Sequence, residues 1–144
     1  MTQRVLAKLL ERAGVGGRAS ELVEAIDDCV HPSLRPGLSG GPAGFSLATG
    51  EAGTVAAVHL PAWRLGRSDA DVRARLLSAA EHQGWDLGAY ARASAPLAAR
   101  RRGAPRAHGI VAWVLAPARP VLLHVGLTPT SAVPQFHRPQ RGMP

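Results

Sequence analysis

Apolar residues near the start of the chain recur with the spacing of two short helices. In the first run they return every three or four residues, at Val5, Leu6, Leu9 and Leu10. Thr2 is a candidate N-cap for this run, and Gly14 ends it. A second run starts at Ser20, another candidate N-cap, and stops before Pro32. The pattern therefore predicts a helical hairpin over residues 2–31.

A third helix is predicted over residues 69–83. Its apolar positions also have helical spacing, at Val72, Leu76, Leu77 and Ala80. Ser68 and Asp71 form an approximate capping box before this run, with Asp in the place of the usual Glu, and Gly84 follows it as a stop. The start signal, the periodicity and the stop all indicate the same helix.

Strands are predicted where apolar and polar residues alternate, or where turn residues bound a short apolar run. Residues 45–60 hold two such segments around the turn 50–53 and predict a hairpin. Residues 109–116 are apolar on both faces, which is typical of a central strand, and residues 121–127 predict a further strand. A weaker alternation predicts a strand near residues 86–93.

Proline and glycine mark the segments between and after these elements. Residues 31–44 contain three prolines and four glycines, which indicates an irregular loop, and the proline-rich residues 128–144 indicate a flexible tail. The order α-α-β-β-α-β-β-β predicts a single α+β domain over residues 1–127. In this fold two N-terminal helices precede an antiparallel sheet of about four to five strands, which packs against the third helix.

Composition limits the class of protein and draws attention to the C-terminal half. With 144 residues, 46% hydrophobic and 19% charged, the chain suits one globular domain. Its net charge of +7 is unevenly placed, because all ten acidic residues lie between Glu11 and Asp86. Residues 87–144 carry eight arginines and no acid. Alanine, glycine, arginine and proline form about half of the chain, and this bias accounts for part of the arginine excess.

Three features bear on the compartment of the protein. Charges at Arg4, Lys8 and Glu11 leave no uninterrupted apolar stretch for a signal peptide. The longest uncharged apolar run, residues 107–118, is shorter than the roughly 20 residues of a membrane helix. Cys29 is the single cysteine, which fits a reducing compartment. We therefore expect a cytoplasmic protein without a membrane segment.

Two glycine-rich strings match catalytic or nucleotide-binding motifs in part. Residues 37–42 resemble the segment around the serine nucleophile of trypsin-like proteases and fit G-x-S-x-G around Ser39. That family has an acid where Leu38 stands and a double barrel that needs a longer chain, so we interpret the string as a loop. Residues 14–19 fit a relaxed dinucleotide fingerprint but follow a helix instead of a strand, which favours an interhelical turn.

Histidines supply two further candidate sites. Asp27 and His31 are four residues apart and would share a helical face, so they are candidate metal ligands. His59 and His124 each interrupt an apolar strand, and a pair facing one groove would suit acid–base cleavage of a phosphodiester. The two-histidine phosphoesterases are similar in outline but carry Ser or Thr two residues after each histidine, where this chain has proline and glycine.

Arginines near the strand predicted at 109–116 are the leading candidates for a binding site. Arg100, Arg101, Arg102 and Arg106 form a dense cluster in a predicted loop between two candidate strands. Arg92 and Arg119 would lie near the base of this loop. Guanidinium groups suit phosphates, and an uncompensated cluster gains affinity by releasing counterions from nucleic acid.

We therefore predict a small non-enzymatic binding protein whose basic C-terminal half docks on nucleic acid or another polyanion. The first alternative is a protein–protein interaction or assembly subunit with an acidic protein partner. A minor alternative is a metal-independent phosphodiesterase that uses His59 and His124. No motif implies a cofactor, and the number of copies in the assembly stays open.

Overall fold

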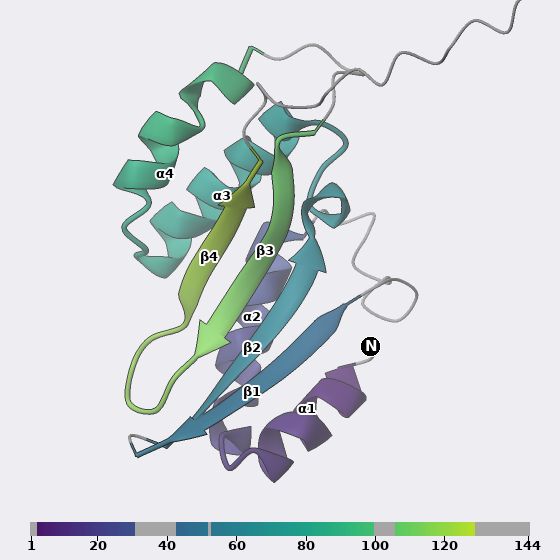
Figure 1. Ribbon diagram of the computed structural model, residues 1–144, viewed down its shortest axis with the longest axis vertical. Helices are drawn as coiled ribbons and strands as arrows, with labels where there is room; N and C mark the ends of the chain where they lie inside the picture. The colour runs from purple at the N-terminus through teal and green to yellow at the C-terminus, as the bar shows by residue number, and fades with distance from the viewer. Residues whose placement is uncertain (1–2, 31–42, 52, 100–105, 129–144) are drawn as a thin grey trace, which may run out of the picture.

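The computed structural model describes residues 3–30, 43–51, 53–99 and 106–128, which form a four-stranded antiparallel sheet and four α-helices (Figure 1). The helices are α1 (Gln3–Arg12), α2 (Ala19–Cys29), α3 (Asp69–Gln83) and α4 (Gly88–Ala93), with short 3-10 turns at Gly16–Arg18, Ala62–Arg64 and Ala95–Leu97. The strands, in spatial order, are β1 (Gly44–Gly50), β2 (Gly53–Pro61), β3 (His108–Leu115) and β4 (Leu122–Leu127). The predicted α+β class with two N-terminal helices and about four strands is confirmed.

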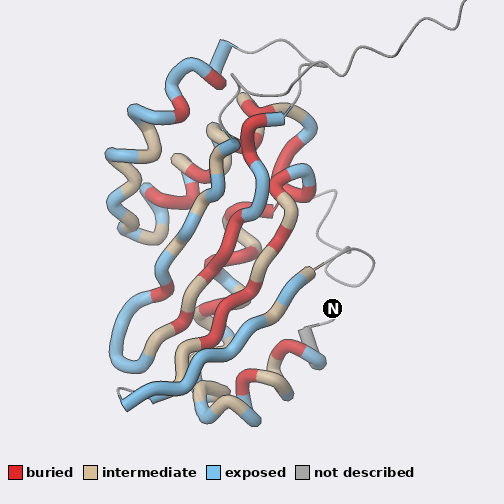
Figure 2. The backbone as a smooth tube through the Cα atoms, viewed as in Figure 1, coloured by how far each residue is buried: buried red, intermediate tan, exposed pale blue. Residues whose placement is uncertain are grey.

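Register and alternation divide the sheet into two faces. Val58 on β2 is paired with Trp113 on β3, and both side chains are fully buried. Residues two positions away along these strands are buried on the same side: Ala56, Leu60, Val111 and Leu115. They belong to one hydrophobic core with Ile26 of α2 and Leu76 of α3. Figure 2 shows buried residues concentrated along the two central strands.

Helix α3 has the boundaries that its sequence predicts. The hydroxyl of Ser68 accepts from the amide of Asp71 at 3.1 Å, and the Asp71 carboxylate accepts from the amide of Ser68 at 3.0 Å. Gly84 ends the helix with a φ of 69°, in the left-handed region where glycine avoids a Cβ clash. Local sequence therefore determines both ends, and the predicted helix over 69–83 is confirmed.

The strand predicted near residues 86–93 is wrong, because this segment forms the helix α4. The Asp86 carboxylate accepts from the amide two residues on at 2.9 Å, and the amide of Ala91 donates to the carbonyl of Leu87 at 2.8 Å. The alternation came largely from alanines, which have the highest helix propensity. Leu87 and Tyr90, three residues apart, both pack against the core, and this tertiary contact favours the helix.

The start of helix α2 is stabilised by a different contact from the predicted Ser20 cap. Its first residue is Ala19, so Ser20 lies within the helix, and no side chain caps the N-terminus. The guanidinium of Arg18 bonds both carboxylate oxygens of Glu21, at 2.6 and 2.8 Å, and donates to the carbonyl of Ala116 at 2.7 Å. The hydrogen bond from Arg18 lowers the pKa of Glu21. Arg18 therefore ties the start of α2 to the turn after β3.

Three predicted features fall largely outside the described residues. They are the candidate N-cap Thr2, nearly all of the loop 31–44, and the tail beyond Thr128. Among the helices that the structure does describe, none has the length and apolar character needed to cross a membrane.

Candidate functional site

One face of the sheet is not covered by any described helix, since α2 and α3 lie behind the opposite face (Figure 1). Alternation places every second residue of each strand on this side. Apart from Gly50 and Gly53 beside the turn, the residues are Gly44, Ser46 and Ala48 of β1, Val55, Ala57, His59 and Pro61 of β2, Ile110, Ala112 and Val114 of β3, and Leu122, His124 and Gly126 of β4. We call these thirteen residues the open face.

The open face carries no Asp, Glu, Lys or Arg. At the chain's own share of 19% charged residues, thirteen positions would hold about two or three charges, and solvent-facing positions usually hold more. Ile110 and Leu122 are large apolar residues of this face that are 56% and 39% exposed. Exposed large apolar residues on a surface without charges favour an interaction site.

A hollow lies at the corner of the open face where β1 begins and β2 ends. Its volume is about 320 Å³, and its lining includes Ala43, Gly44, His59, Leu60, Pro61 and Ile110. The hydroxyl of Ser46 lies 2.8 Å from Nε2 of His59. Within the described part of the chain no acid bonds this histidine, so the exposed pair lacks the orienting group that activates a serine nucleophile.

The sheet register places both histidines of the predicted pair on the open face. His59 is paired with Ala112, and Ala112 with His124, so the three residues form one row across the sheet. Two strand spacings separate the histidine backbones, roughly 10 Å. The contact with Ser46 holds the His59 ring on the β1 side, away from His124. The pair therefore shares a row, while its role in phosphodiester cleavage stays a prediction.

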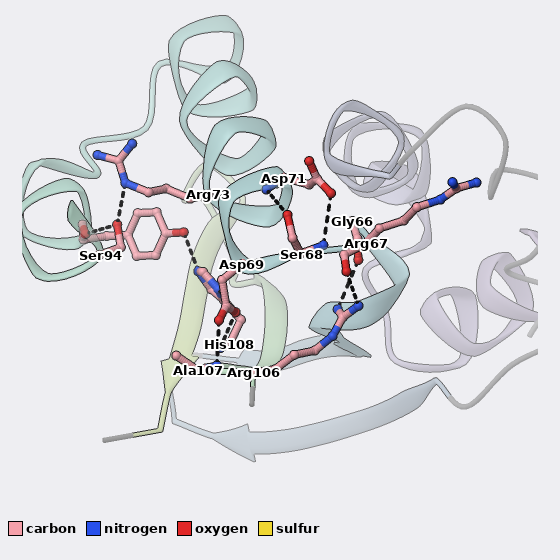
Figure 3. Close-up of polar contacts among 11 residues, drawn as sticks. Gly66, Arg67, Ser68, Asp69, Asp71, Arg73, Ser94, Arg106, Ala107 and His108 are labelled. Carbon is pink, nitrogen blue, oxygen red and sulfur yellow. Dashed lines mark hydrogen bonds and ion pairs between the residues drawn. The ribbon is translucent and has the colours of Figure 1, made fainter. Parts of the chain in front are cut away.

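A second histidine centre lies inside the molecule, where α3, α4 and β3 meet (Figure 3). The Asp69 carboxylate accepts from His108 Nδ1 at 2.8 Å and from the amides of His108 and Ala107 at 3.1 and 2.9 Å. The hydroxyl of Tyr90 lies 2.8 Å from His108 Nε2. Because a carboxylate only accepts, Nδ1 of His108 donates to Asp69.

Two members of this Asp69–His108–Tyr90 network are buried, and Tyr90 is partly buried. The side chain of His108 is 0% exposed and that of Asp69 is 4% exposed. Burial by itself would raise the pKa of Asp69, but the hydrogen bonds from Ala107 and His108 hold that pKa below its usual value. Burial raises the pKa of Tyr90 to about 12. With its imidazole and its carboxylate buried, the network serves to join β3 to α3 and α4.

Arg73 extends the same network and fastens α4 to α3. Its Nε donates to the hydroxyl of Ser94 at 3.2 Å, and its terminal nitrogen donates to the carbonyl of Ala91 at 3.3 Å. Ser94 is fully buried, and its hydroxyl donates to the carbonyl of Tyr90 at 2.7 Å. These contacts hold Tyr90 where it meets His108.

The arginines that the sequence groups together are spread over the structure. Arg106 donates to the carbonyls of Gly66 and Arg67, at 3.1 and 2.8 Å, and so fastens the chain before β3 to the loop before α3 (Figure 3). Arg92 is exposed in the last turn of α4. Arg119 follows β3, at the opposite end of that strand from Arg106, roughly 25 Å away along the strand. Outside the described residues lie Arg100, Arg101 and Arg102.

The other sequence candidates form no site in the described structure. Helix α2 ends at Cys29, which places Asp27 in its last turn, while His31 and Ser39 lie outside the described residues. The described part of the chain contains no group of three residues that could hold a metal ion. Residues 14–19 connect α1 to α2, with no strand before them, as expected for an interhelical turn.

Sequence reasoning missed the open face, although a signal for it is present. Residues 43–61 contain one charged residue, Glu51, and residues 107–127 contain one, Arg119. Charge-poor hairpins are visible in the sequence, but the residues that share a face follow only from the register. The Asp69–His108 contact had no such signal, because the two residues are 39 positions apart.

Comparison of this chain with known protein families, curated proteins and solved structures finds no match. Inference about function therefore starts from the geometry of the chain itself. Its two most distinctive features are a charge-free open face and a buried acid–histidine network.

Proposed function

We propose that the protein is a non-catalytic interaction module that binds a protein partner through its open face. The observation that carries the proposal is the lack of any charged side chain at the thirteen positions of that face, on a chain with a net charge of +7. A partner can therefore cover the face without removing a charge from water. Small residues such as Ala57 and Ala112 allow a partner to approach the sheet closely.

Catalysis has weaker geometric support, because neither of the two histidine centres described above is both accessible and oriented by an acid. The His59–Ser46 pair is accessible, but no acid in the described structure orients its imidazole. The Asp69–His108 pair has the acid, but the histidine is fully enclosed. An interaction role needs neither feature.

Ala112→Glu tests the proposal, since it places a carboxylate at the centre of the open face and leaves the covered face unchanged. Ala89→Glu controls for the added carboxylate, because Ala89 is exposed on α4, away from the open face. Wild type and both variants are immobilised and incubated with extract of the producing cells, and recovered proteins are identified and quantified. We expect wild type and A89E to retain one stoichiometric partner and A112E to lose it with an unchanged circular dichroism spectrum. Equal recovery by all three would contradict the proposal.

Binding of nucleic acid or another polyanion is the second candidate, favoured by the arrangement where β3 begins. Exposed Arg67 and Arg106 meet there, through the bond from the Arg106 guanidinium to the Arg67 carbonyl. In the sequence, this point directly follows the stretch with Arg100, Arg101 and Arg102. Phosphate contacts by such a cluster would weaken steeply with salt. An acidic protein surface would meet the same arginines.

Fluorescence anisotropy with labelled single-stranded RNA and duplex DNA tests this second candidate. Wild type is compared with the triple change of residues 100–102 from Arg to Ala, and with Arg119→Ala as a control at the other end of the sheet. We expect the triple variant to lose most of its affinity, R119A to bind like wild type, and wild-type affinity to fall at least tenfold between roughly 50 and 200 mM salt. Absence of wild-type binding at low salt would contradict this candidate.

A further inference from the structure

We propose that the open face binds a second copy of this chain, in a twofold-symmetric dimer whose two open faces stack on each other. This inference rests on the proposed function, because it names the occupant of the same surface. Three properties of the open face bear on which partner fits it: its lack of charge, its pattern of projecting and recessed side chains, and its area.

Charge favours self-association through this face over other parts of the surface. The residues whose side chains the structure describes include ten basic and ten acidic ones, so a contact through other parts of the surface would have to pair these charges or remove them from water. The open face has no charged residue at its thirteen positions, and stacking it leaves the arginines and lysines in water. An acidic partner would find no arginine or lysine on this face with which to pair.

The pattern of projecting and recessed side chains on the open face suits a twofold-symmetric dimer. Ile110 and Leu122 project from it, whereas Ala57 and Ala112 are only 9% and 8% exposed. The two projecting residues lie toward opposite ends of the sheet, because Ile110 is near the start of β3 and Leu122 is paired with Val114 near its end. A twofold rotation can therefore place the projecting side chains of one copy against the two recessed alanines of the other. Side chains of stacked sheets interdigitate in this way.

The extent of the face indicates a reversible dimer. Four strands spaced about 4.8 Å apart, each roughly seven residues long, present about 450 Å² in projection. If both faces are treated as flat, stacking them removes roughly 900 Å² of surface from water. This area is close to the lower limit of about 1,000 Å² for a specific interface. We therefore expect monomer and dimer to exchange with concentration.

Analytical ultracentrifugation of the full chain tests the dimer. Between about 1 and 500 μM the wild-type mass should rise from 15.1 kDa toward twice that value. The transition should persist at high salt, because apolar contacts are not screened. Ala112→Glu and Ile110→Glu should each weaken association at least tenfold, and Ala89→Glu should behave like wild type. Ile110 is more than half exposed, so its replacement leaves the core intact.

Two results would overturn the inference. One is a wild-type chain that stays at 15.1 kDa over the whole range. The other is a dimer that both open-face variants retain, since its contact would then lie elsewhere, such as along the outer edge of β4, which pairs with no further strand among the described residues. The proposed function fails separately, because a monomeric chain that loses a different protein partner through A112E would still support binding by the open face.

Discussion

The contact between Asp69 and His108 shows how single residues hold distant parts of this fold together. Asp69 is the first residue of α3, so its carboxylate also lies at the positive end of the helix dipole. It accepts from two amides and one imidazole at the start of β3. Removing the carboxylate would leave buried donors without their charged acceptor, which is among the more costly changes in a protein interior.

We predict that Asp69→Asn lowers the free energy of unfolding by about 3 kcal/mol, because a donating NH2 group replaces one of the two accepting oxygens and the negative charge is lost. Glu81→Gln is the control, an acid-to-amide change at an exposed position of α3, with an expected effect below about 0.5 kcal/mol. Urea unfolding of the three proteins measures the difference. Equal stability of D69N and E81Q would show that the network does not stabilise the fold.

Lowering the pH should destabilise the fold through protonation of the same residue, Asp69. The folded-state pKa of Asp69 is depressed, so its contribution is present above the unfolded pKa of about 3.9 and disappears as the pH falls through the folded value. We predict that wild type loses more stability than D69N between about pH 5 and pH 2. Urea unfolding at a series of pH values checks this, and parallel curves for the two proteins would contradict it.

Alkali should destabilise the protein through Cys29 and Tyr90. Burial raises the pKa of the Cys29 thiol from 9.0 to about 12 and that of Tyr90 from 10.0 to about 12. Because the unfolded chain ionises first, stability is full below about pH 9 and then falls by about 1.4 kcal/mol per pH unit for each ionising group. Cys29→Ala and Tyr90→Phe should each make this decline shallower in urea unfolding between about pH 8 and pH 11. If the decline of stability with pH had the same slope in both variants as in wild type, Cys29 and Tyr90 would not be its cause.

At the scale of elements, helix α3 is determined by its local sequence, whereas helix α4 is determined by its packing against the core. The ends of α3 depend on contacts between residues three or four apart, which the sequence displays directly. The segment of α4 has small residues at alternate positions, a pattern that suits a strand or a helix equally. Packing of Leu87 and Tyr90 against the core, and the bonds from Arg73, favour the helix.

The local origin of α3 leads to a prediction for its cap. Ser68→Ala removes the acceptor for the Asp71 amide and should lower the free energy of unfolding by about 1 kcal/mol. Ser78→Ala, at an exposed position within the same helix, should leave it unchanged or raise it slightly. Thermal and urea unfolding of both variants measure the difference. Similar stabilities for S68A and S78A would contradict a capping role.

At the scale of the whole molecule, Trp113 connects the sheet to the N-terminal helices. It is fully buried at the centre of the covered face, and its indole N–H donates to the carbonyl of Ala25 on α2 at 3.1 Å. The core that contains it draws on α1, α2, α3 and all four strands. One cluster of side chains therefore stabilises both layers, while the open face on the other side contributes little to that core.

Trp113→Phe should lower the free energy of unfolding by about 2 kcal/mol, because the Ala25 carbonyl loses its donor and the smaller ring leaves space in the core. Trp63→Phe supplies the matched control, since Trp63 is 49% exposed, and its effect should stay below about 0.5 kcal/mol. Guanidinium unfolding followed by circular dichroism measures both. A larger loss in W63F than in W113F would contradict this description of the core.

The sequence by itself determined the α+β class, the helical hairpin, the β-hairpin of residues 45–60, the strands near residues 109–116 and 121–127 and the limits of α3, because caps, stops and periodicities act between near neighbours. It did not determine α4, whose short pattern needed the core to select a helix. Only the tertiary structure decided that His59, Ala112 and His124 share one row, that Arg106 and Arg119 lie at opposite ends of β3, and that Asp69 meets His108. Register and long-range packing set these relations, since a shift of one residue would turn the charge-free positions of a strand toward the core.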